Sequence, residues 1–158
     1  QAMPITLGIV ATDLQSGQGI LFRSGNTGQA VRASSAVPGV FEPVRIGSRE
    51  YVDGGLVAPV PVNYARQLGG EVVVAIDISS EPTAEAASSQ AQVVLKTFSI
   101  MGRNINTNEL KNADVVLRPA LAGVSSADFG NRERSIEAGR AAMRQALPRI
   151  RALLAKGV

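Results

Sequence analysis

The order of three neighbouring segments most limits which folds this chain can adopt. Residues 62–68 are predicted to form a helix, with Pro61 near its first turn and two glycines directly after its end. The apolar run VVVAIDI follows at 72–78, and an almost continuous apolar run is typical of a strand covered on both faces. A helix, a glycine stop and a buried strand in this order predict an α/β fold.

Further short elements are predicted on both sides of this unit. We expect strands at 4–14, 20–23, 43–46, 49–52 and 114–117, a helix at 27–36, and a largely helical stretch at 93–113 with a break near Gly102. Residues 79–92 are rich in Ser, Ala and Glu and have no apolar period, so they are predicted to be a mobile surface loop, a solvated connector rather than a functional lid.

The absence of two residue types removes most standard catalytic machinery. The 158 residues include no Cys and no His. A disulfide, a thiol nucleophile, a histidine-based triad and a zinc site of the usual type are therefore excluded. A general base must be a carboxylate or, as the alternative, a lysine, and we expect no metal and no cofactor. With 45% hydrophobic residues, the composition is that of one globular domain.

The positive charge is concentrated near the C-terminus. Residues 131–158 hold seven basic and two acidic residues, whereas the rest of the chain is slightly acidic. An apolar stripe predicts an amphipathic helix over about 131–157, with a kink or restart at Pro148. The stripe is Ile136, Met143, Leu147, Ile150 and Leu154. We expect its arginines to be the solvated side of a packed helix; peripheral contact with an anionic membrane is the alternative, and no nucleic-acid partner is expected.

Three aspartates end predicted strands, where ligands collect in α/β sheets. Asp13 and Asp77 are expected to fix neighbouring loops through hydrogen bonds. Asp53 differs because Gly54 and Gly55 follow it, and two glycines let the backbone turn sharply and bring the carboxylate close to another loop. These three letters alone are equally compatible with a hairpin turn and with a catalytic loop.

Two longer blocks surround this acid. ASSAVPGVFEPV occupies 33–44 and YVDGGLVAPVPV occupies 51–62. Together they resemble the C-terminal half of bacterial patatin-like phospholipases, and weaker similarity extends over 4–79 and reappears at 113–119 and 126–129. The resemblance implies a three-layer α/β/α fold with a mostly parallel central sheet. Residues 1–158 would form only the C-terminal portion of that one hydrolase domain.

The same resemblance implies a serine lipid acyl hydrolase, a phospholipase, lysophospholipase or esterase that uses a Ser-Asp dyad without histidine or metal. Asp53 would be the catalytic base, with Gly54 and Gly55 shaping its loop. The substrate would be a lipid or another acyl ester. The competing hypothesis is a non-catalytic α/β binding or scaffold module that kept the hydrolase framework.

The chain contains no recognisable nucleophile. The family's glycine-rich oxyanion loop and its G-x-S-x-G elbow lie upstream of the matched part, and no G-x-S-x-G occurs here. The nearest sequence, GVSSA around Ser125, follows the base and lacks the strand-to-helix setting of an elbow. Ser34 and Ser35 are expected to pack beside the active-site loops. We therefore expect the chain to supply only the Asp, to be inactive alone, and to pair with a missing N-terminal half.

The location of the protein is predicted only broadly. No apolar stretch approaches the roughly 20 residues that a membrane-spanning helix needs. There is no signal-like segment, and the first residue is Gln1 rather than a start Met. We expect a cytoplasmic protein or one peripherally associated with a membrane. Nucleotide binding is not indicated, because no G-x-G-x-x-G or Walker pattern is present.

Overall fold

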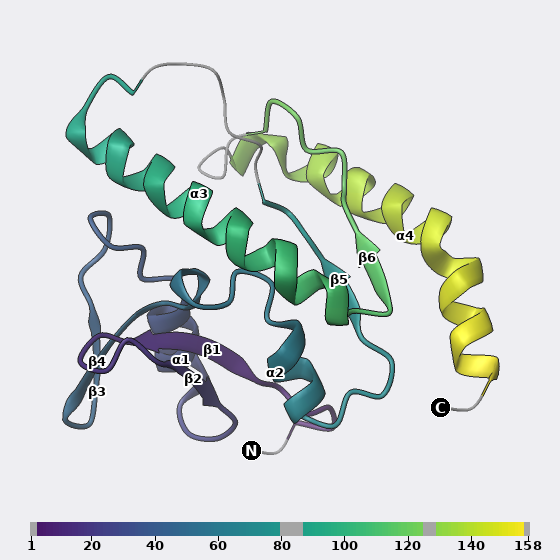
Figure 1. The fold of residues 1–158 in the computed structure, drawn as a ribbon, viewed down its shortest axis with the longest axis horizontal. Helices are drawn as coiled ribbons and strands as arrows, with labels where there is room; N and C mark the ends of the chain where they lie inside the picture. Colours follow the sequence, from purple (N-terminus) through teal and green to yellow (C-terminus); the bar gives the residue numbers. More distant parts are fainter. Residues whose placement is uncertain (1–2, 80–86, 125–128, 157–158) are drawn as a thin grey trace.

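The computed structural model describes residues 3–79, 87–124 and 129–156 (Figure 1). They form a four-stranded sheet and a separate two-stranded sheet. In Figure 1 the two-stranded sheet lies between the two long helices α3 and α4, and the four-stranded sheet lies below α3. The mixed α/β class predicted from the sequence is confirmed.

The larger sheet is antiparallel and has the strand order β2-β1-β4-β3. Its strands are β1 (Ile9–Asp13), β2 (Gly19–Phe22), β3 (Val44–Ile46) and β4 (Arg49–Asp53). The connections within both hairpins contain a glycine with positive φ, Gly17 at 70° and Gly47 at 64°. Residues with a side chain rarely adopt a positive φ, so glycine is favoured at these two positions. Connections this short can join only antiparallel strands.

Helix α1 (Thr27–Ser34) packs on this sheet and completes the first core. The Oδ1 atom of Asn26 accepts a hydrogen bond from the backbone N–H of Gln29 and so caps the start of the helix. The core consists of Ala11, Ala33, Ala36, Val44 and Tyr51. Small residues on both surfaces let α1 approach the sheet closely, and this approach brings the end of α1 next to the end of β4.

The second core joins helix α2 (Val62–Gln67) to the parallel pair β5 (Val74–Ile76) and β6 (Val115–Leu117). Gly69, with φ at 92°, follows the end of α2 as predicted. The buried residues of this core are Val60, Val62, Val73, Ala75 and Leu110. Leu110 begins the short 3-10 helix η2 (Leu110–Asn112), which continues from α3 (Gln90–Glu109).

The strand predicted at 72–78 is shorter and less covered than expected. Ala75 in its middle is buried, whereas 54% of Ile76 and 67% of Ile78 are exposed. The sequence pattern suits two covered faces, but the described residues cover the strand incompletely because the small sheet has only β6 beside β5. Of the predicted mobile loop, residues 80–86 lie outside the described part, and the last residues, from Gln90, are helical.

Of the two predicted helix interruptions, the break near Gly102 is wrong and the kink at Pro148 is present. Helix α3 continues through Gly102, and a Cβ atom at this position would lie 3.2 Å from Cγ of Pro59. The glycine therefore permits close packing and does not break the helix. Helix α4 (Arg132–Ala155) does not restart at Pro148, which lies inside it. The kink is present, because Figure 1 shows the helix changing direction in its yellow part.

The amphipathic C-terminal helix is present, but none of its residues is buried among those described. Of the predicted stripe, Leu147 and Ile150 are half-buried, whereas Ile136, Met143 and Leu154 are exposed. Within residues 3–79, 87–124 and 129–156, no helix has both the length and the apolar character required to cross a bilayer.

Candidate active site

The backbone of Asp53 is held where three elements meet. Asp53 ends β4 and lies opposite Ala11 in the middle of β1. Its N–H donates to the carbonyl oxygen of Ala36, just beyond α1, at 3.0 Å. Its own carbonyl oxygen accepts a hydrogen bond from Oγ1 of Thr12 at 2.8 Å. The strand end that carries this carboxylate is therefore fixed by β1, β4 and the end of α1.

The two glycines after Asp53 lie where little space is available for a side chain. They open the 3-10 turn η1 (Gly54–Leu56). A Cβ atom on Gly54 would lie 2.2 Å from the backbone oxygen of Val10, and one on Gly55 would lie 2.9 Å from Oδ1 of Asp53. The first contact involves the backbone of β1, an inner strand of the sheet, which cannot move aside without disturbing the pairing of its neighbours. Position 54 therefore cannot accept a side chain in this geometry, whereas a side chain at position 55 would require the Asp53 carboxylate to shift.

The carboxylate of Asp53 is half-buried and lacks a cation among the described residues. Its Oδ1 accepts a hydrogen bond from the N–H of Gly55 at 2.7 Å. Burial raises the pKa of Asp53 above its usual value, and the Gly55 hydrogen bond opposes this rise only in part. A carboxylate in this state accepts a proton more readily than an ordinary surface aspartate does.

Asp13, the second strand-end acid, holds a loop as expected. Its Oδ1 accepts hydrogen bonds from the N–H groups of Gln15 at 2.9 Å and Ser16 at 3.3 Å, and its Oδ2 is paired with Arg49. Burial alone would raise the pKa of Asp13, but these hydrogen bonds and the Arg49 guanidinium outweigh it and hold the pKa below its usual value. Asp13 is thus a structural anion.

Asp77 also fixes its neighbours. Its Oδ1 accepts from the N–H of Ser79 at 3.1 Å, and Nε of Arg118 lies 3.2 Å from its Oδ2. Partial burial would raise the pKa of Asp77, but the bonds from Ser79 and Arg118 lower it below its usual value. Of the three candidate acids, Asp53 is therefore the one whose environment suits a base.

The sequence reasoning did not find the residues that support the segment after Asp53. Asn106 and Glu109 are buried on one side of α3. Oδ1 of Asn106 accepts a hydrogen bond from the N–H of Val60 at 3.2 Å, and Oε1 of Glu109 accepts one from the N–H of Asn63 at 3.1 Å. In the sequence, the only indication was that these two polar residues are three positions apart on a helix. Polar residues with the same spacing also occur on the solvated face of a helix, so the spacing did not distinguish them. These bonds tie α3 to the chain that continues from the Asp-Gly-Gly turn.

The candidate serines are not joined to Asp53 by a hydrogen bond in the described part of the chain. Ser34 is half-buried in the last turn of α1, and Ser35 is exposed directly after it. Ser125 lies outside the described residues. The same portion of the chain shows no group of three or more acidic residues arranged to hold a metal ion.

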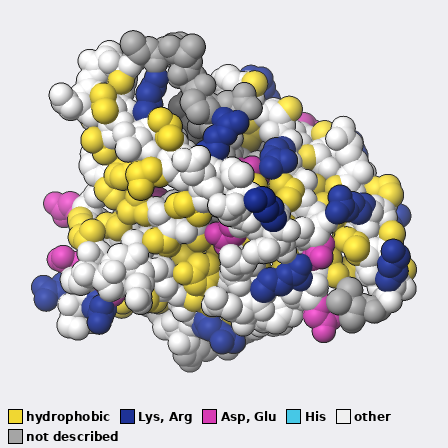
Figure 2. All heavy atoms as spheres, viewed as in Figure 1, with side chains coloured by type: hydrophobic (Ala, Val, Ile, Leu, Met, Phe, Trp, Pro, Cys, Tyr) yellow, Lys and Arg dark blue, Asp and Glu magenta, His cyan; other side chains and the backbone are white. Residues whose placement is uncertain are grey.

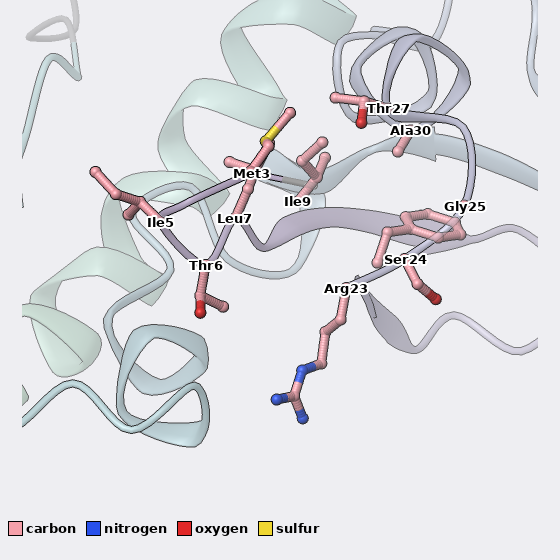
Figure 3. Close-up of a pocket in the computed structure, with 11 residues that line it drawn as sticks. Met3, Ile5, Thr6, Leu7, Ile9, Arg23, Ser24, Gly25, Thr27 and Ala30 are labelled. Atoms are coloured by element: carbon pink, nitrogen blue, oxygen red, sulfur yellow. The ribbon is translucent and has the colours of Figure 1, made fainter. Parts of the chain in front are cut away.

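A cavity of about 200 Å³ lies near the N-terminal end of β1 (Figure 3). Its walls include the apolar side chains of Met3, Leu7 and Ile9, and Arg23 stands on the opposite side in the close-up. A second hollow lies along the outer side of α1. Neither of these two cavities includes Asp53.

The fold and the site together define an α/β protein with a partly buried aspartate on an Asp-Gly-Gly turn at a strand end. Comparison with known proteins shows which family this part of the chain resembles. Residues 5–66, which contain this turn, match the family model described as patatin-like phospholipase. The resemblance predicted from the two sequence blocks is confirmed over this part of the chain: residues 5–66 are similar to patatin-like phospholipases.

Curated relatives support the same relationship. One uncharacterized NTE family protein of Mycobacterium tuberculosis is 29% identical over 104 residues, which are 66% of this chain and 29% of that relative. Another from the same organism is 28% identical over 164 residues, covering 87% of this chain and 28% of the relative. The chain thus spans less than a third of the length of these relatives.

Proposed function

We propose that this chain supplies the catalytic base, Asp53, of a lipid acyl hydrolase that works through a Ser-Asp dyad. The observation that carries the proposal is the state of the Asp53 carboxylate. It is half-buried, its pKa is raised, and in the described part of the chain no cation pairs with it. The patatin-like relationship makes lipid acyl esters the expected class of substrate.

The position of the carboxylate suits proton transfer. Oδ1 accepts the hydrogen bond from Gly55, which orients the group, and no hydrogen bond within the described residues engages Oδ2. In the proposed reaction, a serine hydroxyl from another segment attacks the ester carbonyl carbon while its proton passes to Asp53. The proton then goes to the leaving alcohol, and an acyl-serine remains.

Water completes the cycle. Asp53 removes a proton from a water molecule that attacks the acyl-serine, and the serine leaves as its alcohol with that proton. Backbone amides of a glycine-rich loop would hold the negative oxygen in both steps, each donor contributing about 3 kcal/mol. No G-x-S-x-G elbow occurs in this sequence, so the 158 residues by themselves are expected to show no ester turnover.

The domain organisation belongs to the same proposal. Residues 1–158 would be the C-terminal portion of one hydrolase domain, completed by a segment that carries the serine. The exposed Ile76 and Ile78 at the small sheet support this proposal, because a strand with this apolar pattern needs cover on both faces. Co-expressing the two portions should remove the apolar-dye binding that we expect for the 158 residues alone.

The decisive experiment uses the protein at its full natural length. Wild type and Asp53→Asn are compared for labelling by a fluorophosphonate and for hydrolysis of a soluble short-chain ester. Loss of the base should lower turnover by about 10²- to 10⁴-fold. Glu50→Gln is the matched control, because Glu50 is an exposed acid on the same strand.

Equal labelling and equal turnover in wild type and Asp53→Asn would remove Asp53 from the mechanism. An unlabelled, inactive wild type that folds normally would instead favour the non-catalytic α/β module.

A further inference from the structure

Helix α4 contacts the rest of the protein through small side chains along its first turns and through larger apolar ones near its C-terminal end. Its half-buried positions follow one face, which is directed at β6. The half-buried residues of the helix are Ser135, Ala138, Gly139, Ala142, Ala146, Leu147, Ile150 and Leu153. Leu147, Ile150 and Leu153 are thus partly covered, whereas three other large apolar residues of the helix are left on its flank.

The large apolar residues of this flank are open to solvent. Ile136 is 51% exposed, Met143 37% and Leu154 62%. Their spacings of seven and eleven residues place them in one row along the helix. An exposed apolar row on a well-formed helix indicates a surface that a membrane or a partner molecule covers.

A row of arginines runs beside the apolar row. At 100° per residue, Arg140, Arg144 and Arg151 lie on the side adjoining the apolar residues, and all three are exposed. Arg140 is paired with Glu137, whereas Arg144 and Arg151 form no ion pair within the described residues. In Figure 2, Lys and Arg side chains gather over the right-hand part of the molecule, where α4 lies, beside hydrophobic atoms.

The other arginines of α4 serve a different purpose. Arg134 donates to the carbonyl oxygen of Ala122 at 2.8 Å, and Arg149 donates to that of Asp114 at 2.7 Å. These two bonds fasten the helix to the body of the protein. The arginines next to the exposed apolar row are thus the ones that remain available to an external anion.

We propose that the α4 ridge, formed by Ile136, Met143, Leu154, Arg144 and Arg151, docks on an anionic lipid surface. An apolar row that can enter the boundary between headgroups and acyl chains, flanked by arginines that meet the headgroups, is the pattern of an interfacial helix. The excess positive charge of residues 131–158 over a slightly acidic remainder concentrates the attraction at this helix.

The apolar half of the ridge selects lipid over nucleic acid. The phosphate backbone of a nucleic acid is bound by cations and hydrogen-bond donors, and it makes no favourable contact with exposed Ile, Met and Leu side chains. A lipid surface uses both halves of the ridge. The inference goes beyond the proposed chemistry and does not depend on it, because docking is measured by binding alone.

The test is co-sedimentation of the full-length protein with vesicles of phosphatidylcholine alone or with 30 mol% phosphatidylserine, about a third of the lipid being anionic. We expect strong preference for the anionic vesicles that weakens as salt is raised. Arg144→Gln with Arg151→Gln should lower that affinity about 25-fold, at roughly 5-fold for each arginine. Arg45→Gln with Arg103→Gln removes the same charge from exposed positions outside α4 and should leave binding nearly unchanged.

A second variant tests the apolar row. Ile136→Ser with Leu154→Ser should reduce vesicle binding about 10-fold while the melting temperature and the hydrolysis of a soluble ester stay as in wild type.

Equal binding to both vesicle types would overturn the proposal, as would equal losses of binding in the two double-arginine variants. If the protein does not bind vesicles and mutating the ridge changes its oligomeric state, the ridge is instead an interface with a second copy of the chain. If the protein binds duplex DNA tightly and does not bind vesicles, the ridge is instead a nucleic-acid surface.

Discussion

Gly54 lies so close to Val10 that a Cβ atom added to the glycine would be 2.2 Å from the Val10 carbonyl oxygen. The turn that carries Asp53 is therefore in direct contact with β1, one of the two inner strands of the larger sheet. This contact fixes the distance between the candidate base and the sheet, and no side chain at position 54 is compatible with it.

Gly54→Ala should destabilise the protein markedly, because the clash is with backbone and either β1 or η1 must move. We expect a loss of about 1–3 kcal/mol in the free energy of unfolding, measured by denaturant titration. Gly139→Ala is the control, since that glycine lies within α4 and has no atom within 4 Å of the added Cβ. The control should be neutral or slightly stabilising. Similar losses in both variants would contradict the packing described for Gly54.

Asn106→Ala should weaken the attachment of α3 to the segment that follows the Asp-Gly-Gly turn. The substitution leaves the buried N–H of Val60 without its acceptor, and an unsatisfied buried group costs about 1–3 kcal/mol. Thermal unfolding of Asn106→Ala and of Asn104→Ala, an exposed asparagine on the same helix, measures the difference. We expect the second variant to melt close to wild type, and equal melting temperatures in the two variants would refute the anchoring role.

Asp53→Asn should stabilise the folded protein at neutral pH. The pKa of Asp53 is raised in the folded state, so ionisation favours the unfolded chain once the pH exceeds the usual value of 3.8. The neutral amide removes that penalty, and its oxygen can still accept from Gly55. The gain should be present at pH 7 and should disappear below about pH 3.8, as followed by urea titration at several pH values. A variant that is less stable than wild type at pH 7 would speak against the burial penalty.

Asp13→Asn should have the opposite pH dependence. Because the pKa of Asp13 is lowered in the folded state, its charge stabilises folding above the usual value of 3.8, and this contribution is lost as the pH falls through the folded pKa. The variant should therefore be less stable than wild type at pH 7 and approach it in strong acid. A pH-independent difference would show that the carboxylate charge and its bonds to Gln15, Ser16 and Arg49 do not matter.

The local order of elements was accessible from the sequence because its signals are local. The glycines after α2 and the apolar runs of the strands act over a few positions, and the predicted strands and helices lie near their predicted places. The Asp-Gly-Gly turn was also recognisable from neighbouring residues alone. The residues that hold the turn and the segment after it were not, because Thr12, Ala36 and Asn106 are distant from it in the chain and no sequence spacing relates them to Asp53.

The amino-acid sequence by itself determined the α/β character, the position of the candidate base and the existence of a basic amphipathic helix. Only the tertiary structure decided that Gly102 is a packing contact and that the apolar stripe of α4 is divided into half-buried and exposed residues. The physical reason is that periodicity shows which residues share a face of a helix, whereas the shape of the opposing surface selects the face that is buried.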